Sequence, residues 1–157
     1  MSGFVPGIVQ GNLNRAAVHI VVTSYPALSL TASTMSKGQA HLTYEGNAVT
    51  QIQTATGIVD SPEPFLMTTL VVNILRTQAV ANAWILQQAT QATIGNVEVY
   101  PDSTSYSPTI IQNTAIQNID NGPYDGSDPT VRVTLRGQVQ INSSMWASLT
   151  GVVAAIL

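Results

Sequence analysis

Few residues of this chain have side chains suited to catalysis. It contains two histidines, His19 and His41, and no cysteine. A serine nucleophile needs a histidine beside it as a base, and the G-x-S-x-G motif is absent. We expect His19 to be a hydrogen-bonded core or interface residue, because apolar residues surround it in the sequence, and His41 to lie on the surface of a hairpin. The sequence therefore predicts that the protein is not an enzyme.

The eight acidic residues also offer little chemistry. They lie mostly in predicted turns, and no two are spaced on one strand so as to aim paired carboxylates into a cleft, as glycoside hydrolysis needs. Asp120, Asp125 and Asp128 could bind calcium, but their loop lacks the EF-hand spacing and is predicted to be a plain turn-rich connection. Glycine motifs for phosphate binding are absent. We expect no cofactor and no metal.

Trp84 and Trp146 could stack on sugars, which would suit a β-sandwich fibre or carbohydrate-binding module. Trp84 falls on the apolar face of a predicted helix with Val80 and Ala83, and Trp146 lies in the apolar C-terminal segment, residues 143–157. Packing in the core or between subunits is the preferred interpretation of both tryptophans. The binding module stays an alternative.

Charged residues make up only 8% of the chain, against about 25% in an ordinary soluble domain. Solubility normally depends on interspersed charged side chains, so we expect much of the surface to be covered by other protein. The formal net charge is −3 and the five basic residues are scattered, which argues against tight binding of nucleic acid. The chain is interpreted as a subunit of an assembly.

The length of 157 residues suits a single domain, residues 1–157. The first residues lack the basic and apolar regions of a secretory signal, and the apolar runs are far shorter than the ~20 residues of a membrane helix. We expect neither a cleaved signal nor membrane insertion.

The pattern of residues predicts a mainly β domain of the α+β class, an antiparallel β-sandwich or partial barrel with one flanking helix. Residues 1–15 are predicted to form an extended N-terminal arm. Residues 17–25 suit a strand buried on both faces. Residues 36–64 have turn signals and few large apolar side chains, which indicates a long hairpin outside the core. Within it we expect a strand over 49–56, stopped by the prolines of 61–64.

The second half of the chain has clearer signals. Residues 67–75 read as a central strand, and Thr77 suits the N-cap of a helix over about 77–91. A further strand is expected over 96–100. Residues 131–141 alternate between apolar and polar side chains, with 110–119 as the expected partner strand.

The alternation in 131–141 separates two sets of side chains. We expect Val133 and Leu135 to point into the core, and we expect the same of Trp84, Val80 and Ala83 of the helix. Arg132 and Arg136 lie on the opposite, polar face of their strand and point the same way.

The order of these elements resembles the tail tube proteins of long-tailed bacteriophages. Four local strings add to the resemblance, which covers about residues 30–146. They are residues 54–64 (TATGIVDSPEP), 73–79 (NILRTQA), 95–102 (GNVEVYPD) and 141–146 (INSSMW). The apolar residues 152–157 do not match the pattern.

The resemblance implies a structural protein of the virion, assembled in the host cytoplasm. It implies hexameric rings stacked into a hollow tube for DNA delivery, with tail sheath, baseplate and tail terminator proteins as partners. It also implies that the hairpin and the arm bind the next ring. The residues then expected at the inter-ring interface are Lys37, His41, Tyr44, Glu45, Gln51, Gln53, Asp60 and Glu63.

DNA must slide through such a tube without binding tightly. A bore lined with arginine would hold phosphate, so we expect Arg132 and Arg136 to face away from the bore. The inner tube of a type VI secretion or other contractile injection system shares this physics and is kept as an alternative.

Overall fold

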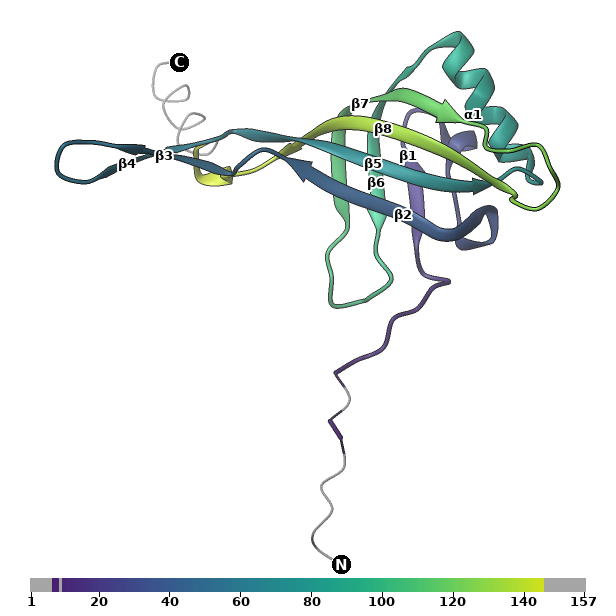
Figure 1. The fold of residues 1–157 in the computed structure, drawn as a ribbon, viewed down its shortest axis with the longest axis horizontal. Coiled ribbons are helices and arrows are strands. Elements are labelled where there is room, and N and C mark those ends of the chain that lie inside the picture. The colour runs from purple at the N-terminus through teal and green to yellow at the C-terminus, as the bar shows by residue number, and fades with distance from the viewer. Residues whose placement is uncertain (1–6, 9, 146–157) are drawn as a thin grey trace, which may run out of the picture.

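The computed structural model describes residues 7–8 and 10–145, and Figure 1 shows its fold. About 49% of the chain is strand, and six antiparallel strands curl into a half-barrel. The order across this sheet is β1-β6-β7-β8-β5-β2, and β3 and β4 form a small second sheet. The expected fold class, mainly β with a partial barrel, is confirmed.

The elements follow one another with short connections. The strands are β1 (His19–Val22), β2 (Met35–Glu45), β3 (Val49–Gln53), β4 (Ile58–Pro62), β5 (Phe65–Leu75), β6 (Thr93–Tyr100), β7 (Thr109–Asp120) and β8 (Thr130–Gln140). The α-helix α1 (Ala79–Thr90) follows β5, and two short 3₁₀ turns, Pro26–Leu28 and Ala32–Thr34, lie between β1 and β2.

Strands β5 and β8 form the centre of the sheet and pair along their whole length, from Phe65 opposite Gln140 to Leu75 opposite Thr130. On its other side β8 pairs with β7, as expected for residues 110–119 and 131–141. Apolar side chains alternate with polar ones in β8, so one face is buried and the other is open. Gly137 permits a close approach of β7, because a Cβ there would lie 2.4 Å from Ile111 Cγ2.

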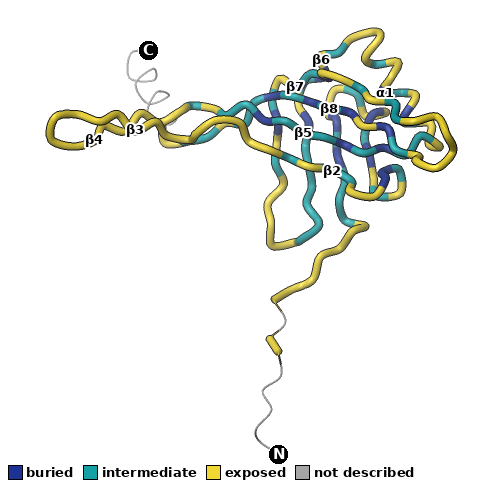
Figure 2. The backbone as a smooth tube through the Cα atoms, in the orientation of Figure 1, coloured by how far each residue is buried: buried dark blue, intermediate teal, exposed yellow. Residues whose placement is uncertain are grey.

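The core fills the concave face of the half-barrel, where α1 and the 3₁₀ turn Pro26–Leu28 pack against the strands (Figure 2). Trp84 is fully buried, and its indole N–H donates to the carbonyl of Leu28 at 3.1 Å. The rings of Trp84 are buried and its N–H has a hydrogen-bond acceptor. This side chain therefore connects the helix to the turn that follows β1. Val133 and Leu135 lie in the same cluster, and Val80 and Ala83 pack against it while remaining partly exposed.

The prediction for the first strand, residues 17–25, is wrong in its length and in its burial. The first strand spans only His19–Val22, and its side chains alternate between half-buried and buried rather than being buried on both faces. The chain leaves the sheet after Val22 and folds back, so that Ile20 exchanges both backbone hydrogen bonds with Leu30.

The helix prediction is correct in place but wrong in detail. The N-cap is Gln78, not Thr77, and no side chain caps the helix. Its buried residues are Ala81 and Trp84, whereas Val80 and Ala83 of the predicted apolar face are only partly buried. The last helical residue is Thr90, and β6 then begins at Thr93, three residues before the predicted strand.

The predicted excursion over residues 36–64 has two parts. Strand β2 is the edge strand of the main sheet and pairs with β5 from Ala40 opposite Val72 to Glu45 opposite Met67. Met35 and Ser36 are buried, so this part belongs to the body of the domain, contrary to the prediction. Only the segment containing β3 and β4 projects beyond it.

Candidate functional site

The projecting β3–β4 hairpin is the part of the molecule most suited to contact another chain. All ten of its strand residues are exposed, and it extends well beyond the half-barrel (Figure 2). Ile52 lies opposite Val59, and Gln53 lies opposite Ile58. An isolated two-stranded ribbon is marginally stable in water, and exposed Ile and Val side chains on one are unfavourable. The hairpin therefore has the properties of a surface that another protein covers.

The expected interface residues fall into two groups. Gln51, Gln53 and Asp60 lie on the projecting hairpin, and Glu63 follows β4 directly. Gln51 donates to Asp60 at 3.3 Å across the ribbon. The strand bounds differ from the prediction of one strand over 49–56. Strand β3 ends at Gln53, and a second strand, β4, continues to Pro62. Pro62 lies opposite Val49 at the base of the ribbon, and a missing backbone donor is tolerated in a strand that has only one neighbour.

The other four expected interface residues, Lys37, His41, Tyr44 and Glu45, lie on β2 in the main sheet. All four are exposed, so they are accessible to a partner although they are not on the projecting hairpin. Sequence reasoning missed Ile52, Ile58 and Val59, because the segment was interpreted as poor in large apolar side chains and only polar and charged residues of the hairpin were expected at the interface.

The polar face of the central sheet carries the two arginines expected to share a side. Arg136 forms an ion pair with Glu45 at 2.8 Å, and both side chains are about 40% exposed. Arg132 lies opposite Asp120 in the β7–β8 register and donates to Asn73 at 3.5 Å. The positive charge of Arg136 on β8 is thus offset by a carboxylate on the edge strand β2, which lies on the far side of β5.

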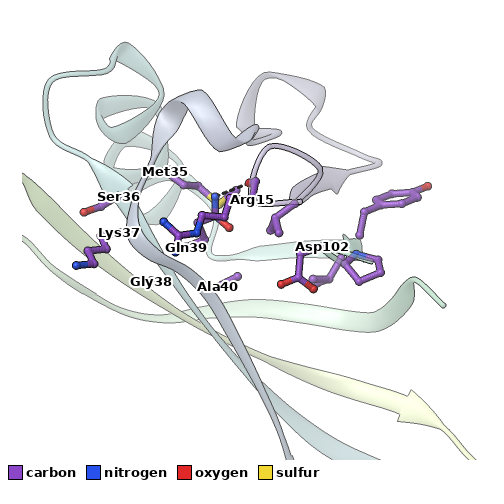
Figure 3. Close-up of a pocket in the computed structure, with 12 residues that line it drawn as sticks. Arg15, Met35, Ser36, Lys37, Gly38, Gln39, Ala40 and Asp102 are labelled. Carbon is purple, nitrogen blue, oxygen red and sulfur yellow. Dashed lines mark hydrogen bonds between the residues drawn. The ribbon is translucent and has the colours of Figure 1, made fainter. Parts of the chain in front are cut away.

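A groove of about 630 Å³ lies where the half-barrel stays open, between β2 and the end of β6 (Figure 3). On the β2 side the strand bulges between Met35 and Ala40, with Gly38 at φ 90° and Gln39 at φ 41°. Gln39 reaches across to donate to the backbone carbonyl of Arg15 at 2.8 Å. The groove is lined by Val18, Met35, Ala40, Val99 and Pro101, with Arg15, Lys37 and Asp102 as its charged residues.

The His19 side chain, on β1, packs against an aromatic ring and lies within hydrogen-bond distance of a backbone carbonyl. The His19 ring stacks on Tyr100, with ring centroids 4.1 Å apart and planes 8° from parallel, and its Nδ1 lies 2.7 Å from the carbonyl oxygen of Ala17. Tyr100 donates to Glu98 at 2.8 Å, and this hydrogen bond to a carboxylate raises the pKa of the tyrosine. His41 lies exposed on β2.

The acidic loop between β7 and β8 is built from local turns. Asp120, Asp125 and Asp128 each accept a backbone N–H two residues further on. Such contacts are typical of aspartate in tight turns. Hydrogen bonds from the Ser127 backbone and hydroxyl lower the pKa of Asp125. The three carboxylates thus organise their own turns.

Arg76 holds this loop against the end of β5. Its guanidinium donates to the carbonyls of Asn121, Pro123 and Asp128, and it lies 5.1 Å from the ring centroid of Tyr124. One side chain therefore fixes both ends of the acidic loop.

Within residues 7–8 and 10–145, no three acidic or histidine side chains gather in a way that could hold a metal ion. No helix in the same part of the chain has the length and apolar character to cross a membrane. Trp84 is buried and cannot stack on a sugar, which removes one basis for the binding-module alternative. Trp146 and most of the C-terminal segment 143–157 lie outside the described residues, as do residues 1–6 and 9 of the predicted arm.

No family model matches the chain, and a search of curated proteins finds no match. The functional argument therefore depends on the fold and on the surfaces described above.

Proposed function

We propose that this chain is a structural subunit of a hollow protein tube, the tail tube of a long-tailed bacteriophage. The observation that carries the proposal is the β3–β4 hairpin, a fully exposed ribbon with apolar residues on its surface. A monomeric protein does not benefit from such a ribbon, whereas a repeating assembly buries it against the next copy. The low charge content supports the same proposal, because stacked subunits cover surface that would otherwise need charged side chains.

The half-barrel supports the proposal in a second way. Strand β2 is a long edge strand whose outer backbone groups do not pair with another strand of the described chain. The opposite edge, β1, is only four residues long and is partly covered by Leu30. Joining sheets between subunits removes such an exposed edge, which is a recurrent hazard for β proteins. We propose rings of six copies, stacked along the tube, that bind sheath, baseplate and terminator proteins and carry DNA in transit.

The prediction that Arg132 and Arg136 face away from the bore stays a prediction. The fold works against it, because the apolar face of β8 packs into the core and only the arginine-bearing face is open. A bore lined by this sheet would contain both arginines, with the charge of Arg136 offset by Glu45. The structure of an assembled tube would contradict the prediction if it placed either arginine in the bore.

The experiment that tests the proposed function is electron microscopy of the purified full chain over a range of concentrations. We expect hollow tubes or stacked rings. A variant in which a short Gly-Ser turn replaces residues 47–62 should remain folded, because all the strand residues removed are exposed, but it should not form tubes. The β2 strand must be kept in this variant because it belongs to the main sheet.

A finer variant tests the apolar surface alone. Ile52→Ser with Val59→Ser removes one opposed apolar pair from the hairpin, and Leu86→Ser on α1 is the matched control with similar exposure. We expect tubes from the control and not from the hairpin variant. A wild-type chain that stays monomeric at all concentrations would overturn the proposed function.

A further inference from the structure

We propose that the groove between β2 and β6 binds the β3–β4 hairpin of a second copy of this chain, with Lys37 and Arg15 meeting the acidic residues Asp60 and Glu63. The inference rests on the proposed function, because it requires copies of the chain to associate. It adds the receiving surface and the charges that match it.

The argument starts from the cations. Arg76 is bound by loop carbonyls, Arg136 is paired with Glu45, and Arg132 donates to Asn73. Arg15 and Lys37 are the two basic side chains without an ion pair or side-chain hydrogen bond among the described residues. Both line the same groove, and both are exposed. The chain has only five basic residues, so two unpaired cations in one groove distinguish this groove from the rest of the described surface.

The hairpin has the opposite charge. Residues 46–64 include two acids, Asp60 and Glu63, and no basic residue. Asp60 has only the 3.3 Å contact with Gln51, and the Glu63 side chain has no partner in the described chain. Asp60 lies on β4, and Glu63 directly follows Pro62, the last residue of that strand. A groove that receives the β4 edge can therefore meet both carboxylates.

Charge also selects this groove over the far end of the molecule. The hairpin lies at one end of the long axis, and the acidic β7–β8 loop lies at the other (Figure 1). Contact between those two ends would bring Asp60 and Glu63 toward Asp120, Asp125 and Asp128, which is unfavourable. The groove has two cations and one carboxylate, Asp102, and so has a net charge of opposite sign to the hairpin. Figure 3 shows Lys37 and Asp102 toward opposite ends of the view, with Arg15 between them.

Such a contact joins different surfaces of two identical chains. A contact of this kind leaves one hairpin and one groove free at the two ends of an open oligomer, so it propagates unless the rotation closes a ring. Because the hairpin and the groove are different surfaces of the chain, the charges of one can be changed by mutation without changing the other.

The test uses charge reversal in the full chain. One variant has Asp60→Lys and Glu63→Lys, and a second has Arg15→Glu and Lys37→Glu. Each alone brings like charges together, so we expect the concentration needed for assembly to rise at least about tenfold, measured by sedimentation velocity. Mixed in equal amounts, the two variants should co-assemble, because the basic hairpin of one fits the acidic groove of the other and the two unaltered surfaces also match.

A matched control separates this effect from net charge. Asp60→Asn with Glu63→Gln and Asp125→Asn with Asp128→Asn change the net charge equally, and the second pair keeps the acceptor oxygens of its turns. Only the hairpin pair should weaken assembly.

The outcomes distinguish the inference from the proposed function. Wild-type tubes together with unaffected assembly of both reversed variants would overturn the groove contact and leave the proposed function in place. Salt-sensitive oligomers that follow the charge-reversal pattern but form no tubes would support the groove contact and count against the tube. Failure of the mixed variants to assemble when each is folded, as shown by circular dichroism, would overturn the inference.

Discussion

Replacing Trp84 by alanine should destabilise the half-barrel more than any other single change in α1. Trp84 has no exposed surface, and it belongs to the same core cluster as the buried residues of β1, β5 and β8. Removing a buried aromatic side chain costs about 3–5 kcal/mol because a cavity remains. For a domain of this size each kcal/mol lowers the melting temperature by about 2–4 °C, so the expected decrease is about 6–20 °C.

Two further variants separate the contribution of the Trp84 hydrogen bond from that of its buried volume. Trp84→Phe keeps an aromatic ring but removes the donor to the Leu28 carbonyl, which should cost about 1–3 kcal/mol in addition to a small loss of volume. Leu86→Ala removes an exposed side chain of the same helix and should change stability by less than about 0.5 kcal/mol.

The assay is thermal and urea unfolding followed by circular dichroism, at concentrations where sedimentation shows the monomer. The order of stability should be wild type and Leu86→Ala, then Trp84→Phe, then Trp84→Ala. If Trp84→Ala melted at the same temperature as Leu86→Ala, Trp84 would not be a core residue and the sugar-binding alternative would regain support.

Three other predictions concern single positions. Gly137→Ala should destabilise the chain by about 1–3 kcal/mol in urea unfolding, because its Cβ would lie 2.4 Å from Ile111 Cγ2 and 2.8 Å from the Gln112 carbonyl; an unchanged midpoint would show that β7 can move away. Arg76→Ala should release the acidic loop and speed hydrogen exchange at residues 121–129, while Arg76→Lys, which cannot reach three carbonyls in the same way, should restore little of the protection. Ser127→Ala should raise the pKa of Asp125 in an NMR titration, but not fully to its ordinary value, because the larger contribution comes from the Ser127 backbone N–H; since the folded pKa is lowered, the associated stability is present at neutral pH and lost as pH falls through the folded value.

The sequence predicted the central strands well because their signals are local. Alternation in residues 131–141 and the β-branched run of 67–75 both place apolar side chains on a surface that only a sheet can bury. The pairing of β7 with β8 also followed, because the turn-rich segment between them brings the strands together.

The edge of the sheet could not be predicted in the same way. Strand β2 has mostly exposed side chains, so its composition resembles that of a projecting hairpin, and only its pairing with β5 assigns it to the body. The groove was missed for a similar reason. Arg15 and Lys37 are far apart in sequence, and only the fold brings them to one site, beside the bulge of β2.

The exposed hairpin also affects how the stability of this protein must be measured. Because the ribbon has no second layer of its own, its backbone hydrogen bonds should open readily in the monomer and exchange with solvent at low free-energy cost. A partner that binds only the ordered ribbon would stabilise it by mass action, so protection of β3 and β4 should rise with protein concentration while that of β5 and β8 stays constant. The monomer would then have a low local stability in the hairpin and a higher one in the half-barrel. The two would become equal only after assembly.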